Sequence, residues 1–226
     1  MNENNKPYIP ALKYTWLTSL YDPIIGLTMR EFSFKQRMIE QADIRMNQRV
    51  LDVGCGTATL AILLKRMHPN IAIVGIDGDS DVLNIARKKA AKASLDITLE
   101  LGIAFELPCA TNYFDHVFSS LLFHHLTTEN KRRTLKEIFR VLKPEGELHV
   151  ADFGKPKNKL MYFISIFMRR LEKTEANFRG LLPQMLEEAG FDRITEYAQY
   201  MTVFSSISLY EAVKPAIDNQ PTRQHC

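Results

Sequence analysis

The sequence lacks the features that mark secreted, membrane-spanning or zinc-binding proteins. Its 226 residues contain only three cysteines, Cys55, Cys109 and Cys226, an odd number without the spacing of a zinc site. The N-terminal residues include no apolar segment typical of a secretory signal, and no run approaches the roughly 18 apolar residues of a membrane helix. We therefore expect a cytoplasmic protein in a reducing compartment, with no bound metal.

An excess of charge of one sign is also missing. The chain has 29 Lys and Arg against 26 Asp and Glu, and the net charge of +3 is dispersed. Nucleic acid is therefore not an expected partner. With 46% hydrophobic residues, the chain is long enough to bury one full core but too short for a second complete domain.

Apolar strand-like runs alternate with amphipathic helical segments from residue 49 onward. The expected strands are 49–53, 71–76, 97–101, 114–119 and 146–152, and the expected helices are 57–67, 80–93, 128–142 and 175–189. Two later runs, 192–203 and 207–213, are joined by a turn so short that they must be antiparallel. The predicted fold class is α/β, a Rossmann-like doubly wound sheet that is mostly parallel and ends in a C-terminal antiparallel hairpin.

A glycine turn follows the first strand and is the most informative stretch of the chain. Gly54 and Gly56 allow the backbone to turn tightly and approach a ligand without a Cβ in the way. The dinucleotide fingerprint requires a third glycine where this chain has Thr59, and the lysine of a phosphate-binding P-loop is absent. Asp52 would repel a pyrophosphate but attract the amino group of an amino acid.

Asp52, Gly54 and Gly56, with Ala58 in place of a last glycine, resemble motif I of the class I S-adenosylmethionine-dependent methyltransferases. Segments between residues 20 and 156 resemble the ubiquinone/menaquinone-biosynthesis branch, which implies a seven-stranded sheet and S-adenosylmethionine as cofactor. The resemblance implies that cofactor contacts come from Asp52, Gly54, Cys55, Gly56, Thr57, Asp77, Gly78, Ile103, Ala104, Phe105 and Ser119.

Asp77 ends the second strand, where an acidic side chain can accept both hydroxyls of a ribose. The alternative role is in the turn before Ser80, an N-cap candidate, and turn chemistry is also the favoured role of Asp79. The family's usual acidic partner of adenine is replaced here by Ile103. Loss of that hydrogen bond costs about 1.5–3 kcal/mol if nothing replaces it, and adenine would then bond backbone at Ala104 and stack on Ile103 or Phe105.

Catalytic groups are not assigned by the sequence. His124 and His125 follow the fourth strand and are weak candidates for a general base, with packing or helix capping as the alternative. Adjacent histidines rarely bind the same ion, so no metal is expected there. An apolar acceptor wall is predicted from the aromatic residues Tyr21, Phe34, Phe163 and Phe167.

Four segments are expected within a single domain of residues 1–226: an N-terminal helical lid at 1–45, a cofactor-binding core at 46–154, substrate-side helices and the hairpin at 155–214, and a tail at 215–226. Residues 155–173 place an apolar run between basic flanks. A helix that closes the acceptor cleft is the favoured interpretation, and peripheral membrane contact is the alternative.

The sequence thus predicts a methyltransferase that acts on a small, partly apolar organic acceptor. Two competing hypotheses are a non-catalytic protein that binds an adenosyl ligand, which the Ile103 departure motivates, and a nicotinamide-dependent oxidoreductase with the same type of sheet. The acceptor, the methylated atom and the oligomeric state are not predicted.

Overall fold

The fold was examined in a computed structural model, which describes residues 31–154, 180–202 and 206–216. The strands are β1 (Arg49–Val53), β2 (Ala72–Asp77), β3 (Thr98–Leu101), β4 (Phe114–Ser120), β5 (Leu142–Phe153), β6 (Asp192–Met201) and β7 (Ser206–Val213). The helices are α2 (Glu31–Gln41), α3 (Thr59–Met67), α4 (Ser80–Lys92), the 3₁₀ turn η3 (Phe123–His125), α5 (Thr128–Val141) and α8 (Leu182–Glu188).

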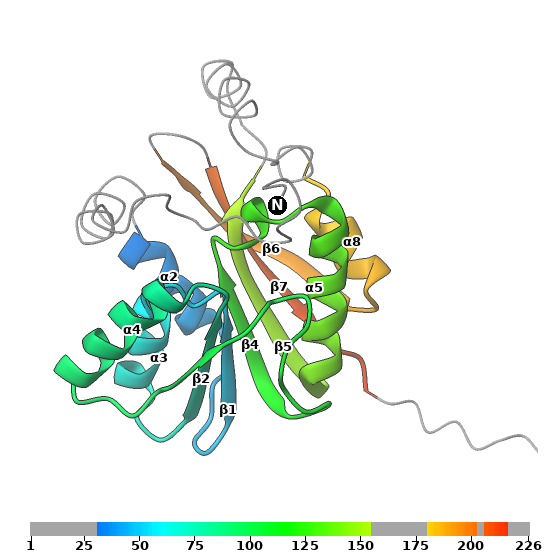
Figure 1. The fold of residues 1–226 in the computed structure, drawn as a ribbon. Coiled ribbons are helices and arrows are strands. Elements are labelled where there is room, and N and C mark those ends of the chain that lie inside the picture. The colour runs from blue at the N-terminus through cyan, green and yellow to red at the C-terminus, as the bar shows by residue number, and fades with distance from the viewer. Residues whose placement is uncertain (1–30, 155–179, 203–205, 217–226) are drawn as a thin grey trace, which may run out of the picture.

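The seven strands form one sheet in the order β3-β2-β1-β4-β5-β7-β6, which confirms the predicted fold class (Figure 1). Pairs from β3 to β5 are parallel, whereas β7 runs antiparallel to both β5 and β6. After β1 the chain builds β2 and β3 on one side and then crosses to β4 on the other. The carboxyl ends of β1 and β4 therefore flank a reversal of strand order, the place where open α/β sheets bind ligands.

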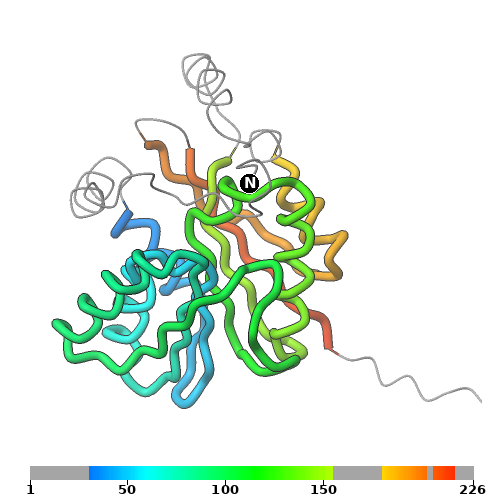
Figure 2. The backbone as a smooth tube through the Cα atoms, in the orientation of Figure 1, coloured from blue at the N-terminus to red at the C-terminus, as the bar shows by residue number. Residues whose placement is uncertain are grey.

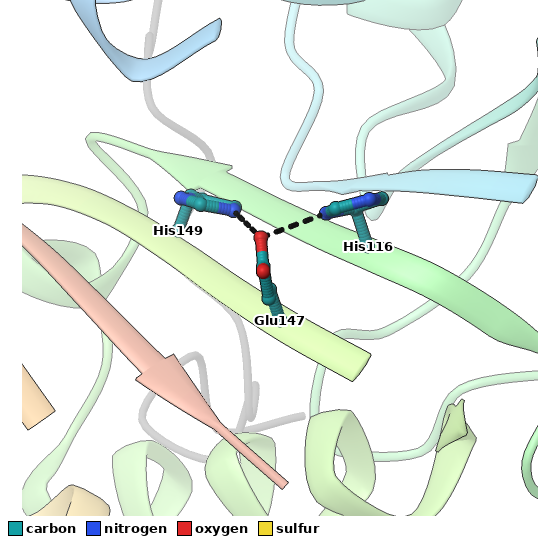
Figure 3. A group of neighbouring side chains, drawn as sticks. All are labelled: His116, Glu147 and His149. Carbon is teal, nitrogen blue, oxygen red and sulfur yellow. Dashed lines mark hydrogen bonds and ion pairs between the residues drawn. The ribbon is translucent and has the colours of Figure 1, made fainter. Parts of the chain in front are cut away.

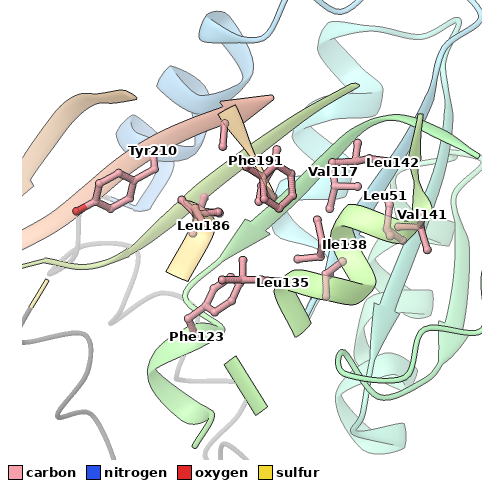
Figure 4. Close-up of a cluster of buried hydrophobic side chains, with 14 of the residues drawn as sticks. Leu51, Val117, Phe123, Leu135, Ile138, Val141, Leu142, Leu186, Phe191 and Tyr210 are labelled. Carbon is pink, nitrogen blue, oxygen red and sulfur yellow. The ribbon is translucent and has the colours of Figure 1, made fainter. Parts of the chain in front are cut away.

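Helices cover both faces of the sheet, as the backbone trace in Figure 2 shows. Helices α5 and α8 pack on one face over a core that includes Leu51, Val117 and Leu142, shown in Figure 4. Helices α2, α3 and α4 cover the other face, over Val50, Phe118 and neighbouring apolar side chains. Successive residues of β1 thus enter opposite cores, as a strand buried on both sides requires.

Several element boundaries differ from those predicted. β5 begins at Leu142 rather than 146, because Leu142 pairs with Phe114 directly after α5 ends. The strand passes through Pro144 and the positive-φ residue Glu145 with a shift of register, so this segment is an irregular strand and not a turn. The N-cap of α4 is Asp79 rather than Ser80: its carboxylate accepts hydrogen bonds from the N–H groups of residues 81 and 82.

The structure describes only part of the expected lid and of the expected C-terminal segments. The lid is described from Glu31 onward as α2, and residues 155–173 and the tail beyond residue 216 are not described. In the described part of the chain, no helix has both the length and the apolar character needed to cross a membrane.

Candidate cofactor and active site

The glycine loop between β1 and α3 is built from left-handed backbone. Gly54 and Gly56 have φ of 69° and 54°, and Ala58, at the position of the family's last glycine, has φ of 60°. The loop keeps its left-handed shape at position 58 even though this conformation costs an alanine about 1–2 kcal/mol. The N–H of Gly54 bonds the carbonyl of Ile76 at 2.8 Å, which holds the loop against the end of β2.

Asp52 is the most unusual polar group of this region. Its carboxylate is 1% exposed on the α2 and α3 side of β1, and neither oxygen meets hydrogen-bond geometry with any described residue. Burial raises the pKa of Asp52 to about 7, an effect only partly offset by the positive charge of Lys35 and the nearby N–H of Ala61. Because buried polar groups are normally paired, this carboxylate beside the glycine loop is a candidate partner for a cationic ligand group.

Lys35 is a residue that sequence reasoning missed. It lies on α2 with 7% exposure and donates a hydrogen bond to Glu31, one turn earlier. A lysine at this spacing from a glutamate is typical of a solvated helix surface, so the sequence gives no sign that its charge faces Asp52. The structure therefore places one residue of the expected lid beside the glycine loop.

The carboxylate of Asp77, at the end of β2, accepts hydrogen bonds from backbone N–H groups in this structure. One carboxylate oxygen accepts the N–H of Gly56 at 2.8 Å, and the other accepts the N–H of Asp79 at 3.0 Å. Burial raises the pKa of Asp77, and these N–H donors oppose the rise. The turn role that the sequence left as the alternative is thus present, and each oxygen retains a lone pair for a ribose hydroxyl.

A narrow pocket at the carboxyl edge of the sheet brings together predicted residues from three loops. It is lined by Gly54, Ile76, Asp77, Gly78, Gly102, Ile103, Ala104, Phe105, Leu122 and Leu126. Its volume is about 30 Å³, close to the space of one water molecule, so an adenosyl group requires side chains such as Leu122 to move. The Phe105 ring is 6% exposed and has the Arg133 guanidinium 4.8 Å from its centroid, which leaves Ile103 as the more accessible apolar surface.

Other predicted cofactor residues lie nearby without lining this pocket. Ser119 is fully buried and its hydroxyl donates to the carbonyl of Val53 at 3.2 Å, which joins β4 to β1. Burial raises the pKa of the Cys55 thiol, so that it stays protonated. The Thr57 hydroxyl accepts a hydrogen bond from Lys89 of α4 at 2.9 Å, which links the loop to the next helix.

Gly54→Ala is expected to lower the free energy of unfolding by about 2 kcal/mol, measured by urea denaturation. A Cβ there would lie 2.8 Å from Leu122 Cδ1, and φ would stay at 69°. Gly56→Ala is the matched control, because Gly56 has a similar φ but no atom of residues 31–154, 180–202 or 206–216 lies within 4 Å of the added Cβ. It should cost only about 1 kcal/mol. Equal losses for the two variants would contradict a close approach of Leu122 to the loop.

A histidine and a carboxylate form a pair at the carboxyl ends of β4 and β5. Nδ1 of His124 lies 3.2 Å from one oxygen of Asp152, whose other oxygen accepts the N–H groups of Phe123 and His124 at 2.7 and 3.3 Å. Burial alone would raise the pKa of Asp152, but the neighbouring His124 and the N–H of Phe153 lower it. An ionised Asp152 orients the His124 ring through Nδ1–H, and Nε2 then carries the lone pair of a base.

The two adjacent histidines differ in environment. Burial, helped by the charge of His124, lowers the pKa of His125 to about 3, so this ring is neutral and a poor proton acceptor. Lys131 on α5 is fully buried, and its amine has no hydrogen-bond partner in the part of the chain that the structure describes. Burial lowers its pKa, and the charge of Asp152 opposes the change. Sequence reasoning missed both residues: Asp152 is 28 residues from His124 along the chain, and Lys131 belongs to an amphipathic helix whose lysines are expected to face solvent.

The predicted acceptor wall is described only in part. Phe34 is fully buried in the core under α2, with its ring 6.4 Å from that of Tyr200, so in this conformation it offers no surface to an acceptor. Tyr21, Phe163 and Phe167 lie outside the described residues.

Comparison with known proteins gives consistent sequence matches. The methyltransferase domain family matches residues 50–146. Demethylmenaquinone methyltransferase of Symbiobacterium thermophilum is 32% identical over 131 residues, 57% of this chain and 51% of that protein, so the match spans about half of that relative. The ubiquinone/menaquinone biosynthesis C-methyltransferase UbiE of Pseudomonas entomophila is 29% identical over 207 residues, covering 80% of this chain and 78% of that protein.

Solved structures share the fold. Phosphoethanolamine N-methyltransferase 2 of Haemonchus contortus, solved with S-adenosyl-L-methionine, superposes with a TM-score of 0.66 at 18% identity. The superposition covers 81% of this chain and 52% of that protein, and at this identity the likeness concerns the fold alone. Residues 50–146 match the methyltransferase domain family, and the sequence matches and the sheet order make the chain similar to class I S-adenosylmethionine-dependent methyltransferases of the ubiquinone/menaquinone-biosynthesis branch.

Proposed function

We propose that this methyltransferase transfers a methyl group to a small, partly apolar organic acceptor that enters beside η3. The observation that carries the proposal is the pocket that joins the glycine loop, Asp77 and residues 103–105 with Leu122 and Leu126. Its leucines flank the 3₁₀ turn that contains His124, so an apolar acceptor would lie between the cofactor loop and this histidine. The quinone-methylating relatives also support an apolar acceptor.

The residues present fit S-adenosylmethionine in three places. Asp52 would attract the amino group of the methionine end, Asp77 would accept the ribose hydroxyls, and Ile103 would cover adenine. When bound, S-adenosylmethionine supplies a sulfonium methyl group for in-line displacement. The chain's own contribution is to hold the acceptor in line, exclude water and, through Nε2 of His124, remove a proton from an acceptor that carries one.

The test is calorimetric titration of the purified chain with S-adenosylmethionine, S-adenosylhomocysteine and NAD in parallel, followed by an acceptor panel of quinols and lipophilic amines. Binding of both adenosyl ligands without NAD, and turnover of at least one acceptor, would support the proposal. Adenosyl binding without turnover on the whole panel favours the non-catalytic hypothesis. NAD binding favours the oxidoreductase.

Asp77→Ala should weaken S-adenosylmethionine binding at least tenfold, because the ribose loses its acceptor. Asp79→Ala is the matched control: it removes the α4 cap and should lower stability by about 1 kcal/mol while leaving the affinity within threefold. Titration calorimetry and thermal unfolding of both variants separate the two effects. An unchanged affinity in a folded Asp77 variant would rule out the ribose role.

A further inference from the structure

A second polar cavity lies at the opposite edge of the sheet from the glycine loop. Its volume is about 340 Å³, and its lining includes Gln48 before β1, His116 near the start of β4 and Glu147 of β5. Parallel strands present their amino ends here, so this cavity is separate from the carboxyl-edge pocket that holds the cofactor residues. The proposed methyl transfer makes no use of it.

Three potential ligand side chains converge beside this cavity. His116 pairs with Glu147 across β4 and β5, and His149 lies two residues further along β5 on the same face. Glu147 Oε2 lies 3.3 Å from His116 Nδ1 and 3.1 Å from His149 Nε2, between the two rings (Figure 3). The two imidazoles are 3% and 0% exposed, whereas Glu147 is partly open to the cavity.

A hydrogen bond to Gln48 fixes the orientation of the His116 ring. Gln48 Oε1 accepts the backbone N–H of Arg45 at 2.6 Å, which fixes the amide oxygen toward His116 Nε2 at 3.1 Å. An oxygen acceptor at this position requires a proton on Nε2. In the neutral ring the Nδ1 lone pair then faces the Glu147 carboxylate, and two facing acceptors require a cation or a proton between them.

We propose that His116 Nδ1, Glu147 Oε2 and His149 Nε2 bind a divalent transition-metal ion, Zn²⁺ in the first instance. Zinc binds nitrogen and oxygen at about 2.0–2.2 Å in a tetrahedral arrangement, which places neighbouring ligand atoms roughly 3.3–3.5 Å apart. The 3.1 and 3.3 Å separations come close to that spacing, and all three ligand atoms lie within 4.8 Å of one another. Water from the cavity would complete the coordination.

The Gln48 contact supplies the outer support that metal-binding histidines usually have. An ion here would connect β4, β5 and the segment before β1, and its position at the amino edge assigns it a structural role rather than one in methyl transfer. The absence of metal-like cysteine spacing does not bear on this site, since its ligands are histidines and a glutamate from two strands.

The experiment is titration of the full-length, chelator-stripped chain with ZnCl₂ by calorimetry, with Co²⁺ absorption as a second readout. We expect one equivalent bound with a Kd at or below about 10 μM, and a rise of the thermal midpoint of at least about 4 °C at saturating zinc. Glu147→Gln and His149→Phe should each weaken binding at least tenfold. His149→Phe keeps the ring stacked on Phe118, which limits structural loss.

Glu145→Gln is the matched control, because Glu145 lines the same cavity but is not among the ligands. It should bind zinc like the unaltered chain. Lack of stoichiometric binding by the unaltered chain, equal weakening by Glu145→Gln and Glu147→Gln, or full binding by both ligand variants would overturn the proposal. S-adenosylmethionine titration of the same samples reports separately on the cofactor site.

Discussion

Asp52→Asn is expected to stabilise the ligand-free chain above pH 7 and to weaken S-adenosylmethionine binding at least tenfold. The carboxylate is buried, has no hydrogen-bond partner of good geometry among the described residues, and has its pKa raised by burial from 3.8 to about 7. A shift of this size corresponds to roughly 4 kcal/mol of destabilisation once the group is ionised. An asparagine avoids the charge but buries an unpaired amide, so a net gain of about 1–3 kcal/mol is expected.

The pH dependence of the unfolding free energy tests the raised pKa of Asp52 directly. Because the folded state holds the Asp52 proton more tightly than the unfolded state, this group's contribution to stability falls as the pH rises from about 4 to about 7 and is level above that. The difference in unfolding free energy between Asp52→Asn and the unaltered chain should grow over the same window. Chemical denaturation at pH 4.5, 6 and 8 measures it, and a difference independent of pH would contradict a raised pKa.

Ligand binding should reverse this behaviour. A cationic amino group beside Asp52 favours the ionised form, so saturating S-adenosylmethionine should reduce the pH dependence assigned to this residue. Lys35→Met is a useful companion variant, because Lys35 lowers the pKa of Asp52. Its loss should raise that pKa further and move the ligand affinity profile to higher pH. If neither Asp52→Asn nor Lys35→Met changes the affinity for S-adenosylmethionine, Asp52 does not contact the ligand.

The sheet was predictable because its pattern is local. Apolar runs ending in a glycine turn, or in an acidic residue such as Asp77, indicate buried parallel strands, and the short link before β7 required an antiparallel pair. The irregular start of β5 was not predictable. Pro144 and Gly146 predict a turn between the helix and the strand, whereas the strand conformation of residues 142–145 depends on pairing with Phe114 across the sheet.

The candidate sites were predictable only where they follow the chain locally. The glycine loop and Asp77 stand at strand ends, so their positions follow from the sequence. The partnership of His124 with Asp152 spans 28 residues, and Glu147 is separated from His116 by 31 residues. These pairs arise from the parallel register of β4 and β5, which no local periodicity encodes.

That same register supports the second large prediction, which concerns His124. With an acceptor that must lose a proton, His124→Gln should lower kcat by about 10²- to 10⁴-fold and leave S-adenosylmethionine affinity within threefold. The ring is oriented by Asp152 at 3.2 Å and belongs to a turn whose flanking residues, Leu122 and Leu126, line the pocket. His125→Gln is the matched control, since the pKa of His125 is about 3 and its ring cannot act as the base near neutral pH.

Asp152→Asn separates orientation from proton transfer. The amide retains the shape of the carboxylate and can still accept the N–H of Phe123, but it no longer stabilises a protonated His124. We expect kcat to fall by a factor between those of the two histidine variants, and the acidic limb of the pH–rate profile to shift to lower pH because the imidazolium loses its counter-charge. If His124→Gln and His125→Gln reduce kcat equally, the pair only stabilises the end of β4; if neither reduces it, the acceptor is nucleophilic without loss of a proton.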